Sequence, residues 1–227
     1  MECYCQGGTP HVVGIHEKTS MALPFFLETG DYIPPRVTEE ELAALTVETE
    51  AALLALGVRD SLAHVEIKQT NHGPQVIEIA SRMGGDYIGE TIQKVYGFDL
   101  VKAGCEIALG IAVTERASAP RTCIMGRYFI PEQSGVVANI RGRSMLRNHP
   151  GVVDFSISKT EGDSIAVPPL GYETAGWVLI EGKTHIDAER VMEEIMRGVK
   201  LAVSPLSPCT EQEQLMLTST VSFPQFS

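Results

Sequence analysis

The feature that most constrains this chain is a pair of short strands, each with a glutamate among apolar residues. Residues 64–68 and 75–80 have strand-like alternation, and a polar loop joins them. A hairpin symmetric about His72 would place Glu66 directly opposite Glu78, with Cβ atoms about 4.5–5.5 Å apart. Two carboxylates at that spacing repel each other unless a cation lies between them or they share a proton. The hairpin therefore predicts either a divalent-cation site or a carboxyl pair that shares a proton.

The faces of these strands follow from the two-residue repeat of a β-strand. Glu66 shares a face with His64 and Lys68, and Glu78 is expected to share one with Val76. A second interpretation remains open, in which both glutamates are solvated at a sheet edge and Lys68 neutralises Glu66. A register slip of one residue would place the two glutamates on opposite faces. The metal site thus depends on the register.

The residues after the second strand add groups that bind anions. Arg82 carries a planar fork of donors at the strand's end, and Gly84 and Gly85 let the backbone approach a ligand. A helix expected to begin at Asp86 would point free N–H groups at the same region. Such a set suits a magnesium-bound triphosphate or an acyl phosphate. The predicted phosphate-binding residues are Lys68, Arg82, Gly84 and Gly85, with Arg82 also catalytic.

The same stretch resembles a known family. The sequence Glu78-Ile79-Ala80-Ser81-Arg82-Met83-Gly84-Gly85 is similar to the E-x-N-x-R-x-G-G motif of ATP-grasp ligases. His64-Val65-Glu66, with the Gly73-Pro74 turn, resembles the strand before that motif. The resemblance extends over about residues 2–203 and is closest to amino-acid (dipeptide) ligases and carbamoyl-phosphate-synthase-like proteins. It implies that Glu66 and Glu78 bind Mg²⁺, or Mn²⁺, and that Arg82 contacts a phosphate or acyl phosphate of an ATP-dependent reaction.

The chain departs from the family pattern in two ways. Ala80 replaces the usual Asn, which leaves open whether one or two metal ions bind, although some amino-acid-ligase relatives also lack this Asn. ATP-grasp proteins also have an N-terminal α/β domain and a small lobe that holds adenine and the α- and β-phosphates, and neither is found in this sequence. We therefore expect a partial chain, or one that works with the missing half or as a homo-oligomer.

The activity that the resemblance implies is formation of a C–N bond. ATP would phosphorylate a small-molecule carboxylate, and an amine or ammonia would attack the acyl phosphate. Positioning and electrostatics would supply the catalysis, with no covalent protein nucleophile. The alternative is a non-catalytic binding or assembly module derived from an ATP-grasp enzyme. The presence of Glu66, Glu78 and Arg82 together favours the enzyme, because a scaffold has no need of them.

Charge and cysteine content restrict the partners and the compartment. The net charge of −11 disfavours binding to nucleic acids and anionic membranes. The five cysteines show no zinc-site spacing and are expected to be reduced thiols. The sequence has no apolar stretch of about 20 residues and no basic segment typical of a signal peptide. We expect a cytoplasmic protein with no nucleic-acid or membrane partner.

The overall pattern predicts an α+β chain that forms the C-terminal part of an ATP-grasp fold. An antiparallel sheet flanked by helices is expected in residues 1–110, which carry the metal site. A smaller β-rich subdomain with a closing helix is expected in residues 111–203, and a weakly ordered tail in residues 204–227. The expected elements include a hairpin over 2–15 and helices from Thr38 to Gly57, from Asp86 to about Tyr96, over 100–109 and over 187–203.

Two further groups are weaker candidates. His16-Glu17-Lys18 ends a strand and could face the site, or it could be a solvated strand end. Arg141 and Arg143 lie in a basic cluster and are candidates for holding a substrate carboxylate by a bidentate contact. The alternative for this cluster is a charged turn that offsets the acidic surface.

Overall fold

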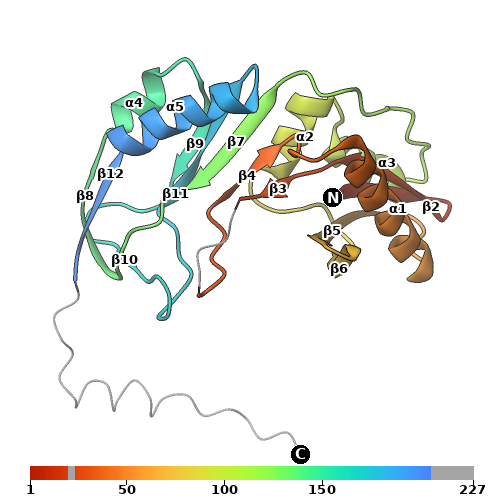
Figure 1. The fold of residues 1–227 in the computed structure, drawn as a ribbon, viewed down its shortest axis with the longest axis horizontal. Helices are drawn as coiled ribbons and strands as arrows, with labels where there is room; N and C mark the ends of the chain where they lie inside the picture. The colour runs from red at the N-terminus through yellow and green to blue at the C-terminus, as the bar shows by residue number, and fades with distance from the viewer. Residues whose placement is uncertain (20–23, 206–227) are drawn as a thin grey trace, which may run out of the picture.

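The computed structural model describes residues 1–19 and 24–205, and its strands form three antiparallel sheets (Figure 1). The first has the order β2 (Thr9–Gly14), β1 (Glu2–Gln6), β5 (Ser61–Thr70), β6 (Gly73–Ala80). The second has the order β3 (Glu17–Lys18), β4 (Gly30–Ile33), β7 (Cys123–Tyr128), β11 (Gly176–Gly182), β9 (Val152–Ile157). The third has the order β10 (Ser164–Ile165), β8 (Gly135–Arg141), β12 (Lys200–Ser204). Antiparallel sheets with flanking helices are the predicted fold class.

The helices fill the space around these sheets. They are α1 (Glu39–Ala55), α2 (Ile88–Tyr96), α3 (Leu100–Ala108), α4 (Arg143–Asn148) and α5 (His185–Gly198). In Figure 1 the first sheet and α1 to α3 lie on the right, while α4, α5 and the third sheet lie on the left. The strands β4, β7 and β11 run between the two ends. Among the described residues, no helix is long and apolar enough to cross a membrane.

Three hydrophobic clusters follow from the alternation of the strands. Cys3 and Val65 point to the face of the first sheet that α1 covers. Tyr4, on the opposite face of β1, packs with Phe98 and Ile92 in the space that α2 and α3 fill between the first and second sheets. The other face of the second sheet packs against α5. The strand pattern of the sequence thus accounts for the core on both sides of the first sheet.

The start of α1 agrees with the prediction and its buried stripe agrees in part. Thr38 caps the helix and Glu41 completes the capping box, as expected. Leu45, Thr49 and Leu53 are buried, but Leu42 and Leu56 are exposed. The buried stripe is therefore narrower than the apolar pattern of the sequence.

The predicted start of the second helix is wrong. Asp86 does not cap it, because α2 begins at Ile88 and its N-cap Tyr87 makes no side-chain cap hydrogen bond. Asp86 has a φ of 50° and its carboxylate accepts a hydrogen bond from the Tyr128 hydroxyl at 2.7 Å. Asp86 therefore makes a tertiary contact with β7 instead of capping the helix. The end is as expected, since Gly97 takes the left-handed conformation.

The predicted closing helix over residues 187–203 is also corrected. Helix α5 ends at Gly198, and residues from Lys200 onward form β12, which pairs with β8. Val199 lies beyond the end of the helix and is buried in the core, so its apolar side chain does not mark a helical face. Ser204 belongs to β12, and from residue 206 onward the predicted tail lies outside the described residues.

The second sheet crosses the predicted boundary between residues 110 and 111. Strands β3 and β4 come from the first segment, and β4 pairs with β7 of the second, with Tyr32 opposite Met125. The division into two segments stays a prediction, and the two share this sheet.

Candidate functional site

The two predicted metal-binding glutamates face each other across β5 and β6. Glu66 pairs directly with Glu78, as the hairpin register predicts. The turn is not symmetric about His72, as the prediction assumed, because two residues join Thr70 to Gly73. A β-bulge between Glu66 and Ile67 then shifts the register by one residue. Without the bulge, the two-residue turn would place Glu66 opposite Ile77. The extra residue in β6 therefore brings the carboxylates together.

The bulge also corrects the predicted faces of β6. Val76 pairs with Ile67, and both pack on the cluster beneath α1, so Val76 does not share the face of Glu78. Ile77 is 63% exposed. A bulge reverses the alternation for the residues that follow it, which explains why the simple two-residue repeat failed here.

Lys18 supplies the positive charge next to Glu66. Its Nζ lies 2.9 Å from Glu66 Oε1 and 3.2 Å from Glu28 Oε2. This Lys18 hydrogen bond, together with the charges of Lys18 and His64, lowers the pKa of Glu66 despite partial burial. Burial opposes protonation of Lys18, but the hydrogen bond to Glu66 and the two carboxylates raise its pKa overall. Both groups are therefore charged over a wide pH range.

The Lys18–Glu66 contact gives a testable pH dependence. The folded-state pKa of Glu66 lies below its unfolded value of about 4.3, so the stabilisation is present above that pH and is lost as pH falls through the folded pKa. Lys18→Met should raise the pKa of Glu66, measured by NMR titration of its carboxyl carbon. Lys183→Met, which changes an exposed lysine elsewhere, is the control. An unchanged titration midpoint for Glu66 in Lys18→Met would contradict the contact.

A buried hydrogen-bonded group holds the strand that leads to Lys18. Asp31 is 6% exposed, and its carboxylate lies 2.8 Å from His16 Nδ1 and accepts a hydrogen bond from the Tyr87 hydroxyl at 3.1 Å. His16 Nε2 lies 3.2 Å from the Thr91 hydroxyl of α2. The candidate triplet His16-Glu17-Lys18 therefore divides: His16 is structural and Lys18 faces Glu66, while Glu17 pairs with Arg36.

Arg82 and the glycine pair lie just beyond the end of β6. Arg82 is exposed and donates from Nη1 to the carbonyl of Met83. Among residues 1–19 and 24–205, no carboxylate forms an ion pair with Arg82. Its charge is thus available to a ligand.

The two glycines differ in their surroundings. Gly84 is buried, its N–H donates to Glu2 Oε2 at 3.0 Å, and an added Cβ would lie 2.5 Å from Ile88 Cδ1. Close packing therefore explains the glycine at position 84. Gly85 is exposed and has open space around its Cα. Of the pair, Gly85 is the one that a ligand can approach.

The remaining predicted residues are distributed over both ends of the molecule. Lys68 is exposed and lines the same cavity as Glu66, Lys18 and Glu28, a cavity of about 540 Å³. Arg141 ends β8 and Arg143 begins α4, where its Nη2 donates to the carbonyl of Lys159. Figure 1 places α4 and β8 at the opposite end from β5 and β6. The structure therefore does not bring the two arginines to Glu66.

The donor set of Glu66 and Glu78 fits a magnesium ion. Both supply hard carboxylate oxygens from facing positions. No group of three or more His, Cys, Asp or Glu side chains in the described part of the chain could hold a metal. Mg²⁺ is commonly held by one or two carboxylates together with substrate phosphates and water, so two protein ligands are sufficient.

Two separate stretches of the chain match models of known protein families. Residues 1–90 match the family model of the ATP-grasp domain, and residues 127–204 match that of L-amino acid ligase C-terminal domain 2. Residues 1–90 therefore carry an ATP-grasp domain segment. The first match contains the Glu66–Glu78 hairpin and Arg82, so the metal-site candidates lie in the ATP-grasp part.

Individual proteins similar to this chain share only part of their length with it. Carnosine synthase 1 of Gallus gallus is 32% identical over 138 residues, which cover 56% of this chain and 15% of that enzyme. The L-amino acid ligase from Bacillus licheniformis has a TM-score of 0.82 at 22% identity, covering 89% of this chain and 51% of that one. The biotin carboxylase domain of Hydrogenobacter thermophilus 2-oxoglutarate carboxylase, solved with MgADP and bicarbonate, has a TM-score of 0.66 at 14% identity, covering 89% and 45%. The chain thus spans about half the length of these structures.

Proposed function

We propose that this chain supplies the metal- and phosphate-binding part of an ATP-dependent ligase that joins a carboxylate to an amine through an acyl phosphate. The observation that carries the proposal is the direct pairing of Glu66 with Glu78, in a hairpin followed by Arg82, which forms no ion pair with the residues that the structure describes. The ATP-grasp family match and the names of the relatives support it.

In this proposal each residue has a distinct role. Glu66 and Glu78 hold Mg²⁺, which when bound neutralises charge on the β- and γ-phosphates. Lys18 pairs with both Glu66 and Glu28 beside a cavity, and its ammonium group can move toward an incoming phosphate. Lys68 and the open backbone at Gly85 add phosphate contacts, and Arg82 stabilises charge on the phosphoryl group as it transfers.

The substrates proposed are small molecules with a carboxylate and an amine, most simply two amino acids. The names carnosine synthase and L-amino acid ligase motivate this choice. ATP and Mg²⁺ are the proposed cofactors, as the MgADP complex of the H. thermophilus domain suggests. A cytoplasmic location remains part of the proposal. Arg141 and Arg143 stay candidates for holding a substrate carboxylate.

The test uses a hybrid, because the relatives are longer than this chain. The chain is joined to the part of the B. licheniformis L-amino acid ligase that lies outside the match. With MgATP and pairs of amino acids, the hybrid should release ADP, and hydroxylamine should trap the acyl phosphate as a hydroxamate. A folded hybrid that binds MgATP but forms neither product, beside an active B. licheniformis enzyme, would refute the proposal.

A further inference from the structure

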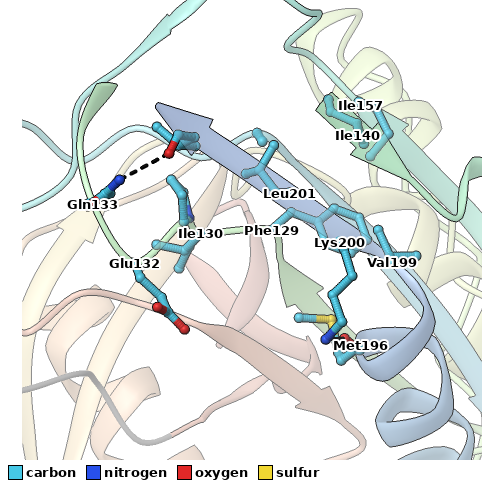
Figure 2. Close-up of a pocket in the computed structure, with 13 residues that line it drawn as sticks. Phe129, Ile130, Glu132, Gln133, Ile140, Ile157, Met196, Val199, Lys200 and Leu201 are labelled. Atoms are coloured by element: carbon cyan, nitrogen blue, oxygen red, sulfur yellow. Dashed lines mark hydrogen bonds between the residues drawn. The ribbon is translucent and has the colours of Figure 1, made fainter. Parts of the chain in front are cut away.

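A second cavity lies far from the Glu66 site, between β12, β9 and the segment that follows β7 (Figure 2). Its volume is about 500 Å³, within the range of about 300–1,000 Å³ found for small-molecule sites. In Figure 1 these elements occupy the opposite end of the molecule from β5 and β6. The ligase scheme gives this cavity no role.

The walls of this cavity combine polar and apolar surface in about equal parts. The apolar part includes six half-buried side chains, those of Ile130, Ile140, Ile157, Met196, Leu201 and Val203. Five of these six pack on one side against the cluster beneath α5, and the cavity lies along their free side. Apolar surface exposed in a concave site is favourable for an apolar ligand group.

The same cavity carries two charges of opposite sign. Glu132 follows β7 and Lys200 begins β12, and both side chains line the cavity (Figure 2). Neither forms an ion pair with any residue in the described ranges. Lys200 Nζ donates only a long hydrogen bond, of 3.5 Å, to the carbonyl of Met196. The side-chain amide of Gln133 donates to the carbonyl of Val203 at 3.0 Å.

We propose that this cavity binds a free α-amino acid with an aliphatic or aromatic side chain. The ligand ammonium pairs with Glu132, the ligand carboxylate pairs with Lys200, and the apolar walls cover the side chain. A fatty acid would leave Glu132 unpaired at the rim, and an amine would leave Lys200 unpaired. The combination of one acid, one base and apolar walls therefore selects a zwitterion.

Calorimetry on the full chain tests this site with defined probes. L-Leucine and L-phenylalanine should bind. Glycine, phenylethylamine and 3-phenylpropanoate should each bind at least tenfold more weakly, because each lacks one of the three recognised groups. Lys200→Met and Glu132→Gln should each weaken L-phenylalanine at least tenfold. The matched controls Lys183→Met and Glu161→Gln change exposed residues outside the cavity and should leave binding unchanged.

Two further variants separate this site from the candidate catalytic site. Glu66→Gln should leave L-phenylalanine binding unchanged, so the inference can stand even if the proposed ligase function fails. Val203→Trp, checked for folding by its melting temperature, should block the cavity and abolish binding. No binding of either amino acid, or binding that is lost in Glu66→Gln and kept in Lys200→Met, would overturn the inference.

Discussion

Replacing Arg82 with lysine should lower kcat of the hybrid ligase about a hundredfold or more, on the order of 3 kcal/mol in transition-state stabilisation. The guanidinium is a planar fork that can grip two oxygens of a phosphoryl group, and lysine keeps the charge but loses this geometry. Arg82 is exposed at the end of β6 and forms no ion pair with described residues. The substitution should therefore change folding and Mg²⁺ binding little.

Turnover and melting temperature of the same variant distinguish the enzyme from the assembly module. The enzyme predicts a large loss of kcat with an unchanged melting temperature. Unchanged turnover with a lowered melting temperature would instead favour a structural role for Arg82. Arg147→Lys in α4, at the other end of the molecule, is the matched control and should have neither effect.

Replacing Asp31 with alanine should lower the free energy of unfolding by about 2–6 kcal/mol, because each of two buried polar groups that loses a hydrogen-bond partner costs about 1–3 kcal/mol. Its carboxylate is buried and bonds both His16 and Tyr87. Without it, two polar groups lose their partner in a site that water reaches poorly. His16 directly precedes β3, so the change should also displace Lys18 from Glu66.

Urea unfolding at neutral pH measures this effect. Asp154→Ala is the control, because Asp154 is exposed on β9 and its carboxylate bonds the neighbouring backbone N–H. The control should lie within about 0.5 kcal/mol of the parent chain. A loss for Asp31→Ala no larger than that of the control would show that the buried group does not hold β3 and β4 in place.

The pairing of Glu66 with Glu78 could be predicted from sequence because its evidence is local. Glu66 and Glu78 lie on two strands of one hairpin, and the alternation of apolar residues reveals both strands. The bulge at Ile77 could not be predicted, because a one-residue shift depends on how Val76 and Ile67 pack beneath α1. The predicted pairing is confirmed, while the predicted faces of β6 are partly wrong.

The contacts that sequence analysis missed join residues far apart in the chain. Lys18 is a candidate within His16-Glu17-Lys18, but no local pattern marks its pairing with Glu66, 48 positions away. Asp86 precedes a helix like an ordinary cap, yet Tyr128, 42 positions away, engages its carboxylate. Val199 fits the helical spacing of apolar residues in α5, but the residues after it pair with β8 and form a strand. In each case tertiary pairing outweighs local propensity.

The most direct test of the central claim is the location of a bound divalent cation on this chain. Mn²⁺ added below one equivalent should broaden NMR signals of residues around Glu66 and Glu78 in β5 and β6. NMR detects weak binding, which suits a site with two protein ligands. In Glu66→Gln and in Glu78→Gln this local broadening should disappear, whereas Glu161→Gln should retain it. Broadening centred elsewhere, or unchanged in Glu78→Gln, would contradict a metal site formed by this pair.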